Sequence, residues 1–172
     1  MMKFKVYKQL DGMDCGPTCL RMVSSHYGRN YSLNKLRELT GFNREGVSML
    51  GLSETAEKIG FRTTGAKLTI GQLKDIQFPA ILHWNQNHFV VLYKIKQSVF
   101  YIADPARGLM SYSVKEFLDY WLSGNEVGNR VGIALLLTPS PDFFAQSGEK
   151  KERLNWGFML RYLYPYKKLI FQ

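Results

Sequence analysis

Two cysteines lie at the start of a predicted helix, in the sequence DCGPTC at positions 14–19. Pro17 suits the first turn of a helix, where its missing N–H group is not needed, so the helix is expected to begin beside Cys15. There the unpaired backbone N–H groups and the positive end of the helix dipole stabilise a thiolate, the reactive form of a cysteine nucleophile. Cys19 lies one turn further on, on the apolar face, which is typical of a buried core cysteine. We therefore predict that Cys15 is a nucleophile, and that Gly16 leaves room beside it for a substrate backbone.

A cysteine nucleophile needs a base, and the chain contains three histidines. His26 follows Cys15 by eleven residues on the same predicted helix, which separates them by about 16 Å and excludes contact. His83 lies inside an apolar run, where a histidine on a sheet face is the ordinary interpretation. His88 opens a predicted strand directly after a polar turn, so it lies at a sheet end and is exposed on one side. His88 is therefore the favoured base.

The base in turn needs a group that fixes its tautomer and orientation. Asp104 ends the strand that follows the one begun by His88, and antiparallel pairing would place the two side by side. The alternative is a turn-forming aspartate before Pro105. Gln9 lies in the loop before Cys15, where its amide could donate to an oxyanion together with the Cys15 backbone N–H. Taken alone, Gln9 is only a weak signal.

The predicted elements that position these side chains divide the chain into a helical first half and a strand-rich second half. The first half is typical of helices, with a cap at Ser32, another at Ser48, and a capping box formed by Thr69 with Gln72. After Pro79, apolar runs alternate with turn-forming residues, which predicts an antiparallel meander. The strands are expected at Ala80–Trp84, His88–Ile95, Val99–Ala103, Met110–Tyr112 and Gly132–Thr138, with a helix from the capping box Ser113–Glu116 before the last one. The fold class predicted is α+β.

Length and composition fit one globular domain. The 172 residues are 45% hydrophobic and 22% charged, which excludes a disordered chain. Two cysteines are too few for a disulfide scaffold, so we expect free thiols in a reducing compartment. We expect no secretory signal at the start and no segment that spans a bilayer, because neither a long apolar run nor an apolar signal region is present in the printed sequence. The net charge of +9 is scattered along the chain, which favours a solvated basic surface over nucleic-acid binding.

The domain is expected to end near Pro139. Residues 140–155 mix Pro, Ser, Gly and charged residues, which is typical of a linker. Residues 156–172 interleave aromatic and basic side chains, a pattern that suits a membrane interface. A terminal helix docked on the domain's own core fits that tail about equally well. We expect that the natural chain continues beyond Gln172.

Four motifs occur in the order found in one known family. They are Gln9 with DCGPTCL at positions 14–20, GVSMLGL at 46–52, HFVVLY at 88–93 and YIADPARG at 101–108. Together they resemble the C39 peptidase domain, found at the N-terminus of bacteriocin-processing ABC exporters, over residues 2–139. The resemblance implies a papain-like fold with the helical N-terminal half packed on an antiparallel β-sheet. It also implies the roles of nucleophile, base, orienting aspartate and oxyanion-hole amide for Cys15, His88, Asp104 and Gln9.

The resemblance further implies a cysteine endopeptidase that cleaves leader peptides after a Gly-Gly pair as an exporter takes up the peptide. The partners implied are that leader peptide and the membrane and nucleotide-binding domains of the exporter, at the cytoplasmic face of the bacterial inner membrane. We expect no metal and no cofactor for the peptidase domain, with ATP needed only by the nucleotide-binding domain. Substrate-binding residues are unknown, although Glu45–Leu52 and Asn85–Asn87 are candidate walls of a narrow cleft.

Two other functions remain open from the sequence. The chain is also compatible with a non-catalytic docking module of an exporter, because some relatives lack the cysteine; Cys15 favours activity. The same residues would serve a transglutaminase-like or amidase acyl transfer. Leader recognition is expected to use an amphipathic helix in an apolar groove, and the positive charge favours acidic leaders.

Overall fold

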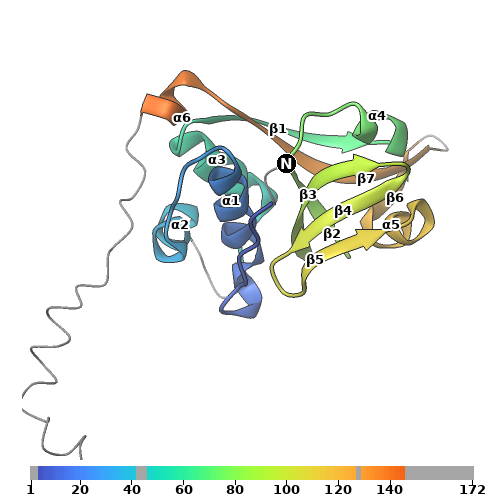
Figure 1. The fold of residues 1–172 in the computed structure, drawn as a ribbon, viewed down its shortest axis with the longest axis horizontal. Helices are drawn as coiled ribbons and strands as arrows, with labels where there is room; N and C mark the ends of the chain where they lie inside the picture. The colour runs from blue at the N-terminus through green and yellow to red at the C-terminus, as the bar shows by residue number, and fades with distance from the viewer. Residues whose placement is uncertain (1–3, 42–45, 127–128, 146–172) are drawn as a thin grey trace, which may run out of the picture.

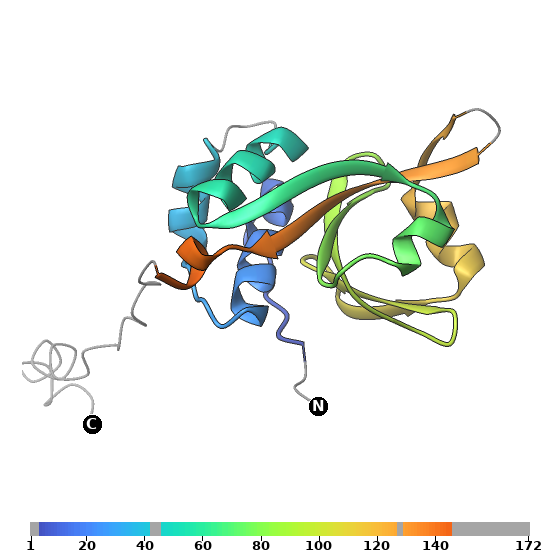
Figure 2. The same cartoon turned by 90° about the horizontal axis from the view of Figure 1, so that it is seen from above.

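The computed structural model describes residues 4–41, 46–126 and 129–145. Within them, helices gather beside one end of a seven-stranded antiparallel sheet, as Figures 1 and 2 show. This arrangement confirms the predicted α+β class, with an N-terminal helical group packed against a sheet. No helix within these three ranges is long and apolar enough to cross a membrane.

The helical group comprises a short 3-10 helix and three α-helices. Their bounds are η1 Gly12–Asp14, α1 Cys15–His26, α2 Leu33–Thr40 and α3 Met49–Lys58. The predicted caps are confirmed, because the Ser32 side chain accepts from the Lys35 N–H and the Ser48 side chain from the Gly51 N–H. Helix α2 ends at Gly41, whose left-handed backbone (φ 61°) terminates the helix at little steric cost.

The sheet contains the predicted meander, in which β2, β3, β4 and β5 are neighbours. The strands are β1 Phe61–Leu68, β2 Ala80–Trp84, β3 His88–Lys96, β4 Val99–Asp104, β5 Gly108–Tyr112, β6 Leu122–Glu126 and β7 Asn129–Pro139. Strand β7 inserts between β1 and β2, and β6 pairs with β7 outside the main path. Figure 2 shows β1 and β7 running together from the helical group to the curled part of the sheet.

Two hydrophobic cores lie on opposite faces of this sheet, because successive strand residues point to opposite sides. Ile81 and Val91 pack towards α1 and α3, whereas their neighbours Leu82 and Val90 pack towards Phe117. The second core is covered by α4 Ile70–Lys74 and α5 Val114–Trp121. Both helices begin with the predicted capping boxes. The sheet therefore separates the core beneath α1 and α3 from the core beneath α4 and α5.

The segment predicted as a linker begins, in the structure, with helix α6 Pro141–Ala145. Its Phe143 is fully buried in the core beneath α1 and contacts Phe61 with ring centroids 4.4 Å apart. Ser140 donates from its hydroxyl to the Gly60 carbonyl. The packed domain thus extends at least to residue 145. Residues 146–155 of the predicted linker and the tail 156–172 lie outside the described residues.

Candidate active site

The N-terminus of α1 holds Cys15 at its first position, as the sequence predicts. The 3-10 helix η1 ends at Asp14 and α1 begins at Cys15, so the cysteine directly follows a short helical turn. Cys15 is 8% exposed, and its thiol lies close enough to His88 to help raise the pKa of that imidazole. A largely buried thiol at a helix N-terminus with a histidine in contact is the arrangement that activates a cysteine nucleophile.

Strand register brings His88 and Asp104 together. His88 is the first residue of β3 and Asp104 the last of β4, and Val91 pairs with Ala103 in the ladder between them. His88 Nε2 lies 2.9 Å from Asp104 Oδ1. The aspartate is almost fully buried and also accepts from the Ala106 N–H at 2.8 Å. The structure therefore brings Cys15, His88 and Asp104 into one connected row.

The charges in this row support one another. Burial acts to lower the pKa of His88, but the hydrogen bonds and charges of Asp104 and Cys15 outweigh it and raise the pKa to about 9. Burial acts to raise the pKa of Asp104, yet the hydrogen bonds from His88 and from the Ala106 and Arg107 amides hold it below its ordinary value. At neutral pH the arrangement therefore favours an imidazolium held against a carboxylate.

The other cysteine and histidines take the places that the sequence indicates. Cys19 is fully buried in the core, and burial beside Cys15 and Asp104 raises the pKa of its thiol well above the usual value, so it stays protonated. His26 lies at the far end of α1, where its ring contacts Phe4. His83 lies on β2 against Phe89, and burial lowers its pKa.

Gln9 is half-buried in the extended segment before η1. Its backbone N–H donates to the carbonyl of Pro105 at 3.0 Å, which ties the segment to the turn that follows Asp104. Its side-chain Oε1 is buried and finds no hydrogen-bond partner among the described residues. This backbone hydrogen bond of Gln9 therefore joins the segment before Cys15 to the turn that follows β4.

The role predicted for Gly16 differs from the one that the structure shows. We expected Gly16 to leave room for a substrate, but it is buried against α3, and a Cβ there would lie 3.0 Å from a Leu52 methyl group. The glycine therefore lets α1 and α3 pack closely beside Cys15.

One buried ion pair next to Cys15 was not predicted from the sequence. Asp14 is fully buried, and its carboxylate accepts from Arg37 on α2 through Nε at 2.7 Å and Nη2 at 2.5 Å. Burial acts to raise the pKa of Asp14, but Arg37 and the Asp11 and Leu10 amides outweigh it and lower the pKa. An aspartate directly before a candidate nucleophile was the available signal; its partner is 23 residues away.

The candidate cleft walls are only partly described. Gly46–Ser48 precede α3, and Glu45 lies outside the described residues. Asn85–Asn87 form the exposed turn between β2 and β3, immediately before His88. Asn87 therefore adjoins His88 along the chain, and Gly46 lies near Met13, two residues before Cys15. The role of both segments as walls stays a prediction.

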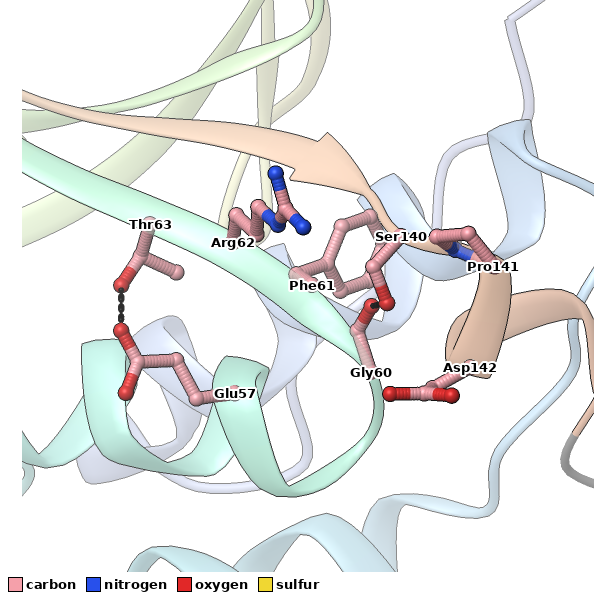
Figure 3. Close-up of a pocket in the computed structure, with 8 residues that line it drawn as sticks. All are labelled: Glu57, Gly60, Phe61, Arg62, Thr63, Ser140, Pro141 and Asp142. Carbon is pink, nitrogen blue, oxygen red and sulfur yellow. Dashed lines mark hydrogen bonds between the residues drawn. The ribbon is translucent and has the colours of Figure 1, made fainter.

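A separate cavity of about 520 Å³ lies where α3, β1, β7 and α6 meet (Figure 3). Its lining is polar: Glu57 accepts from the Thr63 hydroxyl, and Ser140 is bonded to Gly60. None of Cys15, His88, Asp104 and Gln9 lines it. The cavity is therefore distinct from the site described above.

Comparison with known proteins gives a consistent family. The model of the peptidase C39 family matches residues 3–125. The colicin V secretion/processing ATP-binding protein of Escherichia coli is 30% identical over 165 residues, which are 96% of this chain and 22% of that protein. The lactococcin-G-processing and transport ATP-binding protein of Lactococcus lactis is 39% identical over 123 residues, or 68% of this chain and 18% of that protein. The chain thus spans about a fifth of the length of these curated relatives.

Solved structures agree with the sequence comparison. A double glycine motif protease from an AMS/PCAT transporter, in complex with the leader peptide, matches with a TM-score of 0.70 and 32% identity, over 80% of this chain and 93% of that one. The peptidase domain of Streptococcus ComA, a bi-functional ABC transporter, matches with a TM-score of 0.68 and 31% identity, over 80% of this chain and all of that one. These likenesses confirm the papain-like peptidase fold expected from the sequence, and this chain belongs to the peptidase C39 family.

Proposed function

We propose that this chain is the cysteine endopeptidase domain of a peptide-exporting ABC transporter, and that it cleaves leader peptides after a Gly-Gly pair. The observation that carries the proposal is the row formed by Cys15, His88 and Asp104, with the thiol at a helix N-terminus. The solved relative that holds a leader peptide, a double glycine motif protease, supports the substrate class.

The residues suit acyl transfer in two steps. In the first, the Cys15 thiolate attacks the carbonyl carbon of the second glycine, and the negative oxygen is stabilised by Gln9 and the Cys15 N–H. His88 then gives its proton to the leaving amine, which breaks the peptide bond and frees the mature peptide. In the second step, His88 takes a proton from water, the resulting nucleophile attacks the thioester, and the leader leaves with a new carboxylate. Asp104 keeps the imidazole oriented throughout.

The surface beside Cys15 offers apolar contacts for a leader. Leu10 and Met13 are exposed on the loop that leads to Cys15, with 78% and 42% of their surface accessible. Leu50 is 68% exposed on the first turn of α3, the helix whose Leu52 touches Gly16. Exposed apolar side chains near a reactive group suit the apolar face of an amphipathic leader helix. The net charge of +9 would favour acidic leaders.

The wider setting follows from the relatives, which carry ATP-binding and transport functions in their names. We place the domain at the cytoplasmic face of the bacterial inner membrane, with the exporter's membrane and nucleotide-binding domains as partners. Hydrolysis by Cys15 and His88 needs no cofactor, and ATP would act only at the nucleotide-binding domain. No nucleic-acid partner is part of this proposal.

The direct test is mass spectrometry of purified chain mixed with a panel of double-glycine precursor peptides. Wild type should make a single cut after Gly-Gly, and Cys15→Ala should abolish it while leader binding persists. Cys19→Ala, which removes the neighbouring buried thiol, is the matched control and should still cut. Binding without cleavage by wild type would instead identify a docking module. Efficient cutting after the glycines are replaced by bulky residues would refute the narrow cleft.

A further inference from the structure

The buried carboxylate of Asp14 closes the loop between the two groups proposed to stabilise the oxyanion. Its Oδ2 accepts from the backbone N–H of Leu10 at 3.2 Å and of Asp11 at 2.9 Å. Leu10 directly follows Gln9, and Asp14 directly precedes Cys15. The Asp14 carboxylate therefore links Leu10 and Asp11, which follow Gln9, to the position directly before Cys15.

Arg37 fixes this carboxylate from outside the loop. Its guanidinium contacts both carboxylate oxygens, a two-point geometry that sets orientation as well as distance. Arg37 belongs to α2, whose Leu36 is fully buried in the core, so the clamp is anchored to a packed helix. On the other side, the Gln9 N–H is tied to Pro105 beside Asp104. The loop is thus held by α2 on one side and by the turn after β4 on the other.

The charge of Asp14 also needs compensation. A carboxylate on the residue before Cys15 would oppose a thiolate, because like charges disfavour each other at short range. Arg37 supplies the opposite charge at hydrogen-bonding distance. Removing Arg37 would leave a fully buried carboxylate without its ion-pair partner.

We infer that Asp14, held by Arg37, is a positioning residue that sets the Gln9 amide and the Cys15 N–H for oxyanion stabilisation. The inference rests on the proposed function for the roles of Gln9 and Cys15. It separates two effects: the Asp14 hydrogen bonds build the oxyanion site, and the Arg37 charge protects the thiolate.

Two rates distinguish these effects in the full chain. Cleavage of a double-glycine peptide develops an oxyanion, whereas alkylation of Cys15 by iodoacetamide needs the thiolate and develops none. Asp14→Asn keeps the side-chain shape but weakens the clamp. We expect its kcat to fall about tenfold or more, since a lost oxyanion donor costs about 10²–10³ in kcat. Its KM should stay within about twofold of wild type, and its alkylation rate should not fall, because the variant removes a negative charge beside Cys15.

Four further variants complete the comparison. Gln9→Ala should show the same split between cleavage and alkylation as Asp14→Asn. Arg37→Met should slow both reactions, and Arg37→Lys should restore alkylation more fully than cleavage, because lysine returns the charge without the two-point contact. Lys35→Gln, which breaks the exposed ion pair with Glu38 on the same helix, should change neither rate.

Parallel losses of cleavage and alkylation in Asp14→Asn, accompanied by a lower Tm, would show a merely structural role and overturn the inference. Unchanged cleavage in Asp14→Asn would overturn it as well. If wild type is alkylated at Cys15 but cuts no leader peptide, the proposed function itself fails. If wild type cuts and only the predicted split is missing, the proposed function stands and the positioning role falls.

Discussion

The two sides of the site are positioned by different physical means. On the helix side, Gln9, Asp14 and Cys15 lie within seven consecutive residues, and side-chain hydrogen bonds hold that short segment in shape. On the sheet side, His88 and Asp104 are sixteen residues apart and meet because two strands pair in a fixed register. The helix side therefore depends on a few polar contacts, whereas the sheet side depends on the packing of a whole hairpin.

This difference predicts how each side fails. A polar clamp fails locally when one partner is removed, and the rest of the fold remains. A strand register fails only with the cores that hold it, because a slip of one residue turns every side chain to the other face. The following variants break or sharpen the contrast, from the largest expected effect to the smallest.

The largest effect is expected from Asp104→Asn, which keeps the sheet but removes the charge behind His88. An amide in place of the carboxylate favours the wrong imidazole tautomer, so kcat should fall by about 10²–10⁴. Peptide cleavage assays measure the loss. Asp142→Asn, on an exposed position of α6, is the control and should cleave normally. Near-normal cleavage by Asp104→Asn would mean that Asp104 does not orient the base.

A smaller effect is expected from a substitution that overpacks the sheet at a distance from the site. A Cβ at Gly132 on β7 would lie 2.3 Å from the Trp121 ring, whose Nε1 donates to the Ile133 carbonyl. Gly132→Ala should therefore lower the free energy of unfolding by about 1–3 kcal/mol, the usual effect of overpacking. Thermal unfolding measures this as a lower Tm.

Gly65→Ala on β1 is the matched control, because no heavy atom lies within 4 Å of its added Cβ. Equal Tm values for Gly65→Ala and Gly132→Ala would contradict the close packing of Trp121 against β7. Below its Tm, Gly132→Ala should still cleave, since the strain lies away from Cys15, His88 and Asp104.

The last effect is a change of stability with pH, which depends on both sides of the site. The pKa of His88 is raised to about 9 in the fold, as Asp104 and Cys15 outweigh burial, against about 6.5 when unfolded. The protonated form then contributes stability that is fully present below about pH 6.5 and is lost as the pH rises through about 9. Urea unfolding of wild type and His88→Gln across this range should show their difference shrinking. A difference that grows with pH would contradict an imidazolium in the resting site.

Local signals carried most of the fold prediction. The caps at Ser32 and Ser48 and the two capping boxes lie where the sequence indicates, because each is a contact between residues three apart. Strand β1 was not predicted. Its residues are mostly polar or half-exposed, Gly65 interrupts it, and it owes its shape to pairing with β7, some seventy residues later.

The same distinction applies to the site. His88 and Asp104 were predicted as neighbours because their positions at strand ends can be seen along the chain. The Asp14–Arg37 pair could not be predicted, since it depends on how α2 packs beside η1. The packing role of Gly16 depends likewise on the approach of α3. Sequence patterns therefore predict contacts between residues of one element, whereas contacts between distant elements depend on how the fold packs.

In the hairpin of β3 and β4, the proposed base His88 and its partner Asp104 lie at the open end, and the turn lies at the other. The turn residues Gln97 and Ser98 are exposed, with left-handed backbone angles of 49° and 62° in φ, whereas His88 and Asp104 lie at the opposite ends of the two strands. Lengthening both strands by one residue beside the turn would leave the ladder near His88 unchanged. Evolution and protein engineers alike can therefore vary the tip of this hairpin, or insert a reporter there, without moving His88 from Asp104.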